Sequence, residues 1–446
     1  MPPDLRDWVP ADHLVHFVID AIEQIDVSRA VINERGTGSE QYPPGLLLGL
    51  LVYSYATGVF SSRQIERSTY ENVAVRLLCA DTHPDHDTLC VFRRKNGSLL
   101  QDAFAQVLEQ AARCGVLKAG GITVAIDGTK VLANASKHSA VSHGHAEKTL
   151  RTLDVEIAEL LAKAEQADAT PLQDGLTIPA EVQRRQERKA QLLRAKAEME
   201  ARAYARFQAE QAGHEAKLAK RAADQAAGKR PRGRPPEAPD PAPQEKDQVN
   251  FTDEESRIMK TKDGFQQACN PQAGVDADSR LIVGQRVSQA CNDKQELVAN
   301  LAEVSRHVKP AAVLVDSGFV SEAAVTAVEV DEQGRRTAVT VFAAVQREAH
   351  GRTVAQLEVR ADPPEPGPAA TFTERLRHRT ATAAGRALYK LRQQTVEPVF
   401  GIIKEAMGFR RFSLRGLAKV SLEWDLVCLA YNLKRLHRLG ADLRAA

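Results

Sequence analysis

The spacing of hydrophobic positions changes several times along the chain, and each change predicts a different kind of element. Up to about residue 118, apolar residues recur at helical spacing, as in SLLQDAFAQVLEQAARCG, and predict several short helices. The most apolar stretch, from Gly45 to Phe60, is shorter than the roughly 20 residues that a membrane span needs. We therefore interpret it as a buried core helix.

Strand patterns begin at residue 122. Residues 122–127 (ITVAID) form a β-branched and apolar run, and VLANAS is expected to be its hairpin partner. A residue pattern typical of strands resumes at SRLIVGQRVSQ, and AAVLVDSG and TAVTVFAAV predict two more strands. Helices are predicted from Asp293 to Val308, in EAAVTAVE, from Arg386 to Met407 and from Leu417 to Leu439. Alternating strands and helices indicate an α/β fold with a mixed or parallel sheet.

A long helical pattern interrupts the sheet. Leucine and isoleucine side chains form one stripe from Glu147 to Glu165, and a highly charged helix follows to about Ala227. We predict an antiparallel helical hairpin inserted into the sheet domain, with its charges on solvated faces. The predicted segments are an N-terminal helical domain (1–118), the first part of the sheet domain (119–140), the hairpin insertion (141–227), a Pro-rich basic linker (228–249), and the second part of the sheet domain with C-terminal helices (250–446).

Charge is unevenly distributed, although the formal net charge of the chain is only +2. From Glu374 to Arg438 there are 14 lysines and arginines against 5 aspartates and glutamates. A basic C-terminal region predicts a localised surface for a polyanion. The six cysteines form no Cys-x-x-Cys pair and lack zinc-finger spacing to histidine, so no zinc motif is predicted.

Three acidic residues stand in contexts that predict chemistry. Asp127 and Asp316 each follow an apolar run, so both are expected at the carboxyl ends of strands, where α/β sheets place their sites. Glu397 lies among helix formers near Tyr389 and Arg392. Taken singly, each acid is equally well explained by a turn or by an ordinary helix position. Together the three carboxylates predict a site for two Mg²⁺ ions and phosphodiester chemistry, since Mg²⁺ prefers oxygen ligands.

Pro398 follows directly after the third acid. A proline inside a helix removes a hydrogen bond, so we expect a helix to begin near Glu397 with Pro398 in its first position, or a kink at this point. Glu397 and Lys404 are two helical turns apart and are predicted to share a face.

Basic residues in several segments are candidates for DNA contact. Arg93 and Arg94 lie on a short predicted helix of a helix-turn-helix-like module, for which a plain helical bundle is the alternative. In the linker, Arg232 and Arg234 flank a glycine as in an AT-hook, which reads a narrow A·T minor groove. Contacts to DNA phosphates, or a merely solvated basic surface, are expected from Lys130, Lys404, Arg411 and Arg415.

Several complete motifs of the chain resemble those of the DDE transposases of bacterial insertion sequences, in the branch of insertion sequence eleven-eighty-two. Related transposases carry a Tyr-x2-Arg-x3-Glu-x6-Lys signature. Here Tyr389-x2-Arg392 and Glu397-x6-Lys404 match, with four residues between Arg392 and Glu397 instead of three. Phe319 stands where a tyrosine is usual. The resembling segments are YPPGLLLGLLVYSYATGVFSSRQIERS, PDHDTLCVFRRKN, VAIDGTKVLANASKHS, NFTDEESRIMKTKDG, AGVDADSRLIVG, VDSGFVSE and the stretch from RALYKLRQQ to AYNLKRL.

The resemblance implies a ribonuclease-H-like catalytic core in which Asp127, Asp316 and Glu397 hold two Mg²⁺ ions, with Mn²⁺ as a substitute. Tyr389 and Arg392 are then expected to contact DNA beside these acids. The implied activity is cleavage of double-stranded DNA at the terminal inverted repeats of the element, followed by strand transfer to target DNA. No covalent protein–DNA intermediate is expected.

A homodimer on DNA is expected because two element ends must be held together. No signal-peptide or membrane pattern is read, so a bacterial cytoplasmic location beside the nucleoid is predicted. Two alternatives stay open: a non-catalytic DNA-binding protein derived from a transposase, and a nuclease of the same fold that cleaves without joining.

Overall fold

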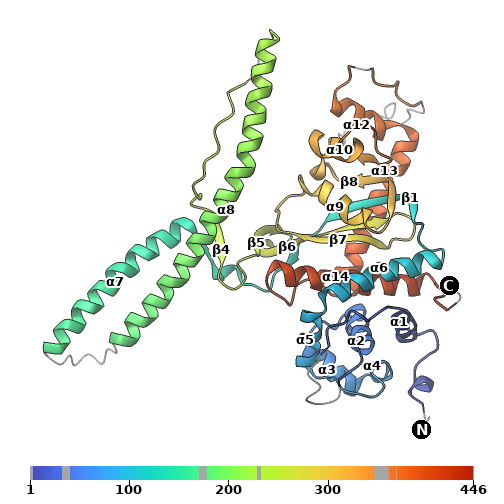
Figure 1. The fold of residues 1–446 in the computed structure, drawn as a ribbon, viewed down its shortest axis with the longest axis horizontal. Coiled ribbons are helices and arrows are strands. Elements are labelled where there is room, and N and C mark those ends of the chain that lie inside the picture. Colours follow the sequence, from blue (N-terminus) through green and yellow to red (C-terminus); the bar gives the residue numbers. More distant parts are fainter. Residues whose placement is uncertain are drawn as a thin grey trace. The chain divides into compact units, whose positions relative to one another are not determined.

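A computed structural model describes residues 4–32, 41–169, 178–228, 233–345, 361–367 and 369–444. Contacts divide the chain into two compact units (Figure 1). The first comprises Met1–Asn134 and Met259–Ala446, and the second comprises Ala135–Ile258. The N-terminal helices and the large sheet therefore belong to one unit, and the helical hairpin belongs to the other.

Short helices fill the N-terminal part of the first unit. Residues 47–56 of the helix predicted between Gly45 and Phe60 are all buried, which confirms a core helix that is apolar on every side. The last helix ends at Arg113, and Gly115 just beyond its cap has a φ of +70°, which suits glycine. The helices are a 3-10 helix (Leu5–Trp8), α1 (Leu14–Glu23), α2 (Pro44–Ala56), α3 (Ser62–Glu71), α4 (Val73–Leu78), α5 (His86–Lys95) and α6 (Gly97–Arg113).

A seven-stranded mixed sheet, counted over the described residues, forms the centre of the first unit. Its main strands lie in the order β7–β6–β1–β8–β9. β6 runs antiparallel to both β1 and β7, whereas β1, β8 and β9 are parallel. This confirms the predicted α/β class with a mixed sheet. The strands are β1 (Gly120–Gly128), β2 (Val131–Leu132), β5 (Arg257–Thr261), β6 (Gly264–Asp276), β7 (Ile282–Ser288), β8 (Lys309–Val315) and β9 (Thr340–Ala343).

The hairpin predicted between ITVAID and VLANAS is wrong. β2 pairs with β6, through Val131 opposite Cys269 and Leu132 opposite Ala268. β1 pairs with the same strand further along, at residues 272–276. Because β6 has 13 residues, it accommodates both segments in succession. β1 and β2 therefore pair with successive parts of the same strand, β6, and not with each other.

Helices from the C-terminal half surround the sheet. α14 packs against α2, α6 and β7. Its Trp424 donates a hydrogen bond from Nε1 to the carbonyl of Gln272 (3.1 Å), and its Asn432 pairs with the backbone of Ile282. The elements are α9 (Glu296–Ser305), a 3-10 helix (Ser317–Phe319), α10 (Glu322–Glu329), α12 (Phe372–Ala381), α13 (Ala383–Gly401), a π-helix (Ile402–Ala406) and α14 (Leu417–Arg438).

The second unit contains the predicted antiparallel hairpin of α7 (His143–Ala169) and α8 (Ile178–Ala226). The ion pairs run in opposite directions along the two helices: Glu156 pairs with Arg185, whereas Glu147, earlier in α7, pairs with Lys196, further along α8 (3.0 Å). A small apolar core around Leu150, Leu192 and Met199 joins the helices. Two short strands, β3 (Ala140–Ser142) and β4 (Gln248–Asn250), pair at the base of the hairpin.

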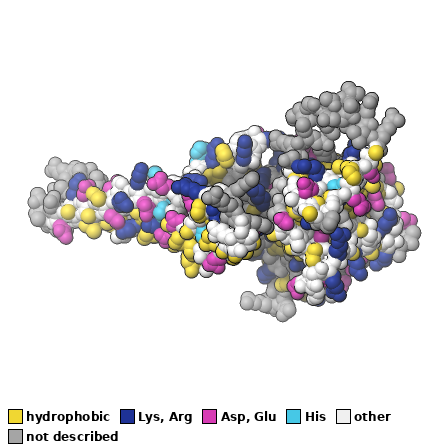
Figure 2. Space-filling view, turned by 90° about the horizontal axis from the view of Figure 1, so that it is seen from above, with side chains coloured by type: hydrophobic (Ala, Val, Ile, Leu, Met, Phe, Trp, Pro, Cys, Tyr) yellow, Lys and Arg dark blue, Asp and Glu magenta, His cyan; other side chains and the backbone are white. Residues whose placement is uncertain are grey.

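Charges of both signs are interspersed along the hairpin (Figure 2). The ion pairs between its helices follow the same pattern, with Arg185 contacting Glu156 (2.7 Å) and Lys189 contacting Asp154 (2.5 Å). The mixture of charges agrees with the prediction that these helix faces are solvated, and it does not indicate a surface that carries charges of only one sign. Among the helices that the structure describes, none is long and apolar enough to cross a membrane.

Candidate active site at the carboxyl edge of the sheet

Two of the three predicted acids lie side by side at the carboxyl edge of the sheet. β1 and β8 are parallel, with Ile126 opposite Val315, so Asp127 and Asp316 are the next residues along two adjoining strands. Asp127 Oδ1 accepts a hydrogen bond from the backbone N–H of Gly128 (2.8 Å). Asp316 caps the short 3-10 helix that follows β8. The strand ends therefore fix both carboxylates close together.

Arg392 joins the third acid to the first. Its Nη1 lies 3.3 Å from Asp127 Oδ2, and its Nη2 lies 3.4 Å from Glu397 Oε1. The Arg392 side chain is only 11% exposed, whereas that of Glu397 is 54% exposed. Tyr389, one turn earlier on α13, donates a hydrogen bond to the carbonyl of Val315 (3.2 Å). α13 is thus fastened across the ends of β1 and β8.

Burial dominates the electrostatics of Asp127. It raises the pKa of this carboxyl to about 6. The Gly128 N–H and the Arg392 guanidinium lower the pKa, and the nearby charges of Asp316 and Asp293 raise it. The pKa of Lys130 is lowered by burial, and Asp293 is the largest of the charges that oppose this shift. Asp127 therefore interacts with Arg392, Asp316 and Asp293 at this edge, and Lys130 interacts with Asp293.

The donor chemistry of the three acids fits a hard divalent cation, because carboxylate oxygens are its preferred ligands. Asp127 and Asp316 adjoin each other, and Glu397 reaches the same place through Arg392. Over the ranges that the structure describes, no three His, Cys, Asp or Glu side chains are close enough to form a metal-binding group. The guanidinium of Arg392 lies between Asp127 and Glu397 and contacts both.

The helix start predicted near Glu397 is wrong. α13 begins at Ala383, where Thr382 caps it by accepting a hydrogen bond from the Gly385 N–H (3.0 Å), and it continues through Pro398. Burial of Thr395, Val396, Val399 and Phe400 holds this segment in helical form despite the hydrogen bond lost at the proline. The helical pattern changes only at Ile402, where a π-helix begins.

Lys404 points back to the residues after Asp127. Its Nζ donates hydrogen bonds to Thr129 Oγ1 and to the carbonyl of Lys130 (2.8 Å). Burial lowers the pKa of Lys404. In this structure Lys404 therefore supports the segment between β1 and β2. Arg415 also contacts this region, through a hydrogen bond from Nε to the carbonyl of Asn134 (2.9 Å).

The other basic candidates differ in exposure. Arg411, Arg415, Arg94 and Arg234 are exposed. Arg93 is only 5% exposed, and its Nη1 donates a hydrogen bond to the hydroxyl of buried Tyr55 (2.6 Å). A DNA contact predicted for Arg93 is at odds with this burial, because α5 turns that side chain inward. Arg232 lies outside the described residues.

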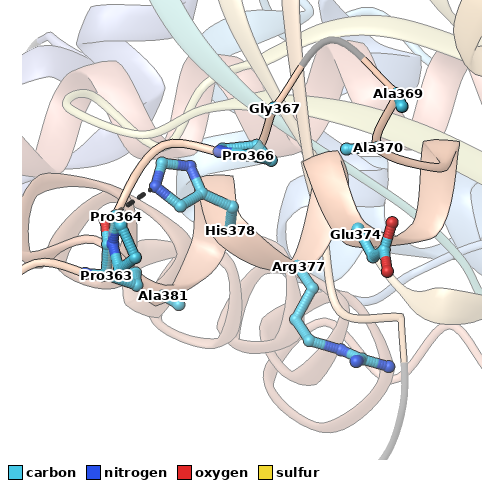
Figure 3. A pocket seen from close by; sticks show the side chains of 10 residues that line it. All are labelled: Pro363, Pro364, Pro366, Gly367, Ala369, Ala370, Glu374, Arg377, His378 and Ala381. Carbon is cyan, nitrogen blue, oxygen red and sulfur yellow. Dashed lines mark hydrogen bonds between the residues drawn. The ribbon is translucent and has the colours of Figure 1, made fainter.

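A separate depression lies beside α12 and contains none of the three acids (Figure 3). His378 Nε2 lies 3.0 Å from the carbonyl of Pro363 there. It is lined by Pro363, Pro364, Pro366, Gly367, Ala369, Ala370, Glu374, Arg377, His378 and Ala381. The depression contains Glu374, Arg377 and His378, but it lies apart from the candidate acids at the carboxyl edge.

Three polar residues near Asp127 were not predicted from the sequence. Asn270 and Gln272, both fully buried on β6, donate hydrogen bonds from their amides to Asp293 Oδ1 (2.8 Å each). An Asn-x-Gln pair on one face of a strand was a usable signal, because inward polar residues need partners. The signal is weak in the sequence because the segment of β6 lacks the alternation of polar and apolar residues that marks a strand.

Two segments of the chain match known family models. Residues 359–437, which include Arg392, Glu397 and Lys404, match the model described as Transposase DDE domain. Residues 3–95 match the model described as Transposase domain (DUF772). No curated protein and no solved structure was found to match the chain. The two matches support a DDE transposase family, although neither segment includes Asp127 or Asp316.

Proposed function

We propose that this protein is a DNA transposase that binds the ends of its own insertion sequence, cleaves them in a Mg²⁺-dependent reaction and transfers the strands to target DNA. One observation carries the proposal. Asp127 and Asp316 end adjoining parallel strands, and Glu397 is tied to Asp127 through Arg392. Acids remote in the sequence thus share one edge of the sheet.

The sheet supports a ribonuclease-H-like core as the scaffold. Three antiparallel strands (β7, β6 and β1) are extended by two parallel ones (β8 and β9) in one continuous order. Asp127 is the last residue but one of β1 and Asp316 directly follows β8, at the end where α/β sheets bind ligands. The branch of insertion sequence eleven-eighty-two is proposed on the matching motifs of the chain.

Asp127, Asp316 and Glu397 are the residues that would hold Mg²⁺, or Mn²⁺ in its place. Two such ions would stabilise the attacking and leaving oxygens of an in-line displacement at phosphorus. Asp127 is the inner acid, since it adjoins Asp316 and contacts Arg392. Lys404 keeps the segment after Asp127 in position through Thr129. Arg392 supplies positive charge between the carboxylates.

DNA contacts are assigned to the exposed Arg94, Arg234, Arg411 and Arg415, to half-buried Lys130 and, from the sequence alone, to Arg232. Arg411 and Arg415 flank the segment that runs beside β2, with the Leu132 N–H bonded to the carbonyl of Arg410 (3.1 Å). Together with Lys130 they would meet phosphates near the catalytic edge. Arg94 and the AT-hook-like Arg232 and Arg234 are the candidates for recognising element ends. Two ends must be held together, so a homodimer on double-stranded DNA, beside the nucleoid, is part of the proposal.

Substitution of the acids tests the proposal. Asp127→Ala, Asp316→Ala and Glu397→Ala should each abolish Mg²⁺-dependent nicking of end-containing DNA and leave binding in a mobility-shift assay intact. Glu405→Ala is the matched control, because Glu405 is an exposed acid on the same helical segment that pairs with Arg410. Mg²⁺-dependent nicking that survives in Asp316→Ala would refute the assignment.

The alternatives give different results in the same assays. A non-catalytic DNA-binding protein would shift end DNA without cleaving it in Mg²⁺ or Mn²⁺. A nuclease of the same fold would cleave, but it would not join pre-cleaved 3′-hydroxyl ends to a target plasmid. Strand transfer by the wild-type protein, lost in Asp316→Ala, favours the transposase.

A further inference from the structure

A buried carboxylate on α14, that of Glu423, holds the loop that carries Arg411 and Arg415. Glu423 is fully buried. The backbone N–H of Ser413 donates hydrogen bonds to both of its oxygens (3.1 and 2.9 Å), and the N–H of Leu414 donates one to Oε2 (3.0 Å). Successive backbone N–H groups of this kind are a natural anion site. Here the anion is a side chain of the protein itself.

The loop of residues 409–415, called the basic loop below, turns its apolar side chains inward and its arginines outward. Phe409 and Phe412 are buried, with ring centres 5.3 Å apart, whereas Arg411 and Arg415 are exposed. The two rings pack the loop onto the core, but they cannot pair its inward N–H groups. Those groups need a polar acceptor inside, and the buried carboxylate supplies it.

A second set of hydrogen bonds ties the basic loop to the chain that follows β1. The Phe412 N–H donates to the carbonyl of Leu132 on β2 (2.8 Å). Asn134 Nδ2 donates to the carbonyl of Ser413 (2.6 Å), and Arg415 Nε donates to the carbonyl of Asn134 (2.9 Å). The loop is therefore fastened on both sides, by the carboxylate within and by the β2 segment outside.

The charge of the buried carboxylate is balanced by Arg93 through Tyr55. Arg93 Nη1 donates a hydrogen bond to the Tyr55 hydroxyl (2.6 Å), and that hydroxyl lies 3.4 Å from Glu423 Oε1. Burial raises the pKa of Glu423, and the Leu414 N–H, the charge of Arg93 and the Ser413 N–H oppose that rise. Buried charged groups are often no more stabilising than apolar residues of similar volume, so stability alone does not account for this network.

We propose that Glu423 is a positioning residue for DNA binding, which holds the basic loop in the form in which Arg411 and Arg415 both meet DNA phosphates. The inference rests on the proposed function, because it assumes that these two arginines contact DNA. Without the inner acceptor, two N–H groups would be buried unpaired, and the loop would rearrange to expose them to water. The two guanidinium groups would then lose their fixed spacing, and both phosphate contacts would weaken together.

The salt dependence of DNA binding tests this role. Affinity for a fluorescent duplex that carries the element end is measured by fluorescence anisotropy over a series of KCl concentrations. Each phosphate contact contributes about 0.9 to the slope of log affinity against log salt concentration. Glu423→Gln keeps the size of the side chain but turns an amide toward the loop N–H groups, so it should lower this slope by about 1.8.

Asp425→Asn is the matched control. Asp425 is also buried on α14, but its carboxylate accepts hydrogen bonds from the side chains of Gln101 (3.3 Å) and Gln285 (3.4 Å) and none from the basic loop. This variant should therefore keep the wild-type slope. A lower slope in Asp425→Asn as well would show that any change in the charge of α14 has this effect, and it would overturn the specific role of Glu423.

Combined variants separate positioning from a general loss of stability. Arg411→Met and Arg415→Met are introduced together into the wild type and into Glu423→Gln. They should lower the slope by about 1.8 in the wild type and by almost nothing in Glu423→Gln, because the contacts are already lost there. If Glu423 acted on stability alone, the arginine changes would have the same effect in both proteins.

The outcomes distinguish this inference from the proposed function. A wild-type slope in Glu423→Gln overturns the role of Glu423, and so do arginine changes that leave the slope of the wild type unaltered. In both cases, Mg²⁺-dependent nicking and strand transfer by the wild type still decide the proposed function. If the wild type neither binds nor nicks the duplex, both proposals fall. Thermal unfolding checks that Glu423→Gln is folded. Should it not be, Glu423→Asp, which keeps the charge but withdraws the carboxylate from the loop, takes its place under the same criteria.

Discussion

Replacing Gly128 by alanine tests the closest packing in the candidate site. The added Cβ would lie 2.1 Å from Gln272 Nε2, and its ordinary contact distance begins at 3.4 Å. The Gln272 amide would have to retreat by the difference, about 1.3 Å. Gly128 has an ordinary φ, since it is not among the glycines with positive φ, so backbone strain adds nothing. The expected effect is purely steric.

The size of the effect follows from the bonds that such a retreat breaks. Gln272 accepts a hydrogen bond from Asn300 (3.0 Å) and donates one to the carboxylate of Asp293 (2.8 Å). A neutral hydrogen bond contributes about 1 kcal/mol and one to a charged group about 1.5–3 kcal/mol. We therefore expect Gly128→Ala to lower the free energy of unfolding by about 2–4 kcal/mol.

Urea denaturation of the full-length protein measures this loss. Gly318→Ala is the control, because a Cβ at Gly318, two residues after Asp316, meets no atom within 4 Å. It should change the free energy of unfolding by less than about 0.5 kcal/mol. When Gln272 is also changed to alanine, most of the cost of Gly128→Ala should disappear. An equal cost with and without the Gln272 side chain would refute the steric account.

Three further predictions use residues outside this contact. Burial raises the pKa of Asp425 to about 6 from 3.8, so stability is lost as the pH rises from about 4 to about 6. Asp425→Asn should therefore raise the free energy of unfolding above that of the wild type by up to about 3 kcal/mol at pH 7. Below about pH 4 the two proteins should be equally stable. Urea denaturation across a pH series measures the difference. Arg93→Ala should destabilise the protein by roughly 2–4 kcal/mol in thermal unfolding, because it strands buried polar groups, whereas exposed Arg94→Ala should not. Lys404→Met should reduce nicking about 10- to 100-fold, because Lys404 holds the segment after Asp127, and should leave the salt dependence of DNA binding unchanged. Arg411→Met should instead lower the slope of log affinity against log salt concentration by the amount expected for about one phosphate contact.

The sequence was sufficient to predict elements with a strong and unmixed pattern. The apolar run of α2, the stripe of α7 and the β-branched strand β8 were all predicted, because one kind of burial dominates each of them. The positions of Asp127 and Asp316 also followed, since a strand that ends in an acid presents it at the carboxyl edge. Local pattern was enough wherever the local and tertiary preferences agree.

β6 shows where that reasoning fails. Its inward positions include Asn270 and Gln272, and Pro271 lies between them, so the segment lacks the alternation of a strand. The polar residues are buried because they bond to Asp293 and Asn300, which come from elsewhere in the chain. For the same reason, the Asp-Gly step after β1 reads as a turn in the sequence, whereas the structure uses the glycine for close contact.

Tertiary packing also overrode local rules at Pro398 and Arg93. Proline normally ends a helix, but the buried residues around Pro398 keep α13 continuous. A basic helix normally faces solvent, but Tyr55 draws the Arg93 guanidinium inward. Tyr55 in turn contacts Glu423 on α14 (3.4 Å), so the N-terminal helices are joined to a C-terminal one by a buried polar link. No property of either residue alone predicts such a link.

Arg392 connects these observations at the carboxyl edge that holds the candidate acids. It stands five residues before Glu397, and side chains five apart on a helix do not share a face. Its guanidinium nevertheless contacts Glu397 and Asp127, because the long side chain reaches from α13 over the end of β1. The extra residue in the Tyr-x2-Arg-x3-Glu spacing therefore does not remove Arg392 from the acids. A single cationic group between two carboxylates offsets their repulsion. It also keeps Glu397 apart from Asp127, so in this arrangement charge balance is achieved by Arg392, and a closer approach of Glu397 to Asp127 requires that side chain to leave its place.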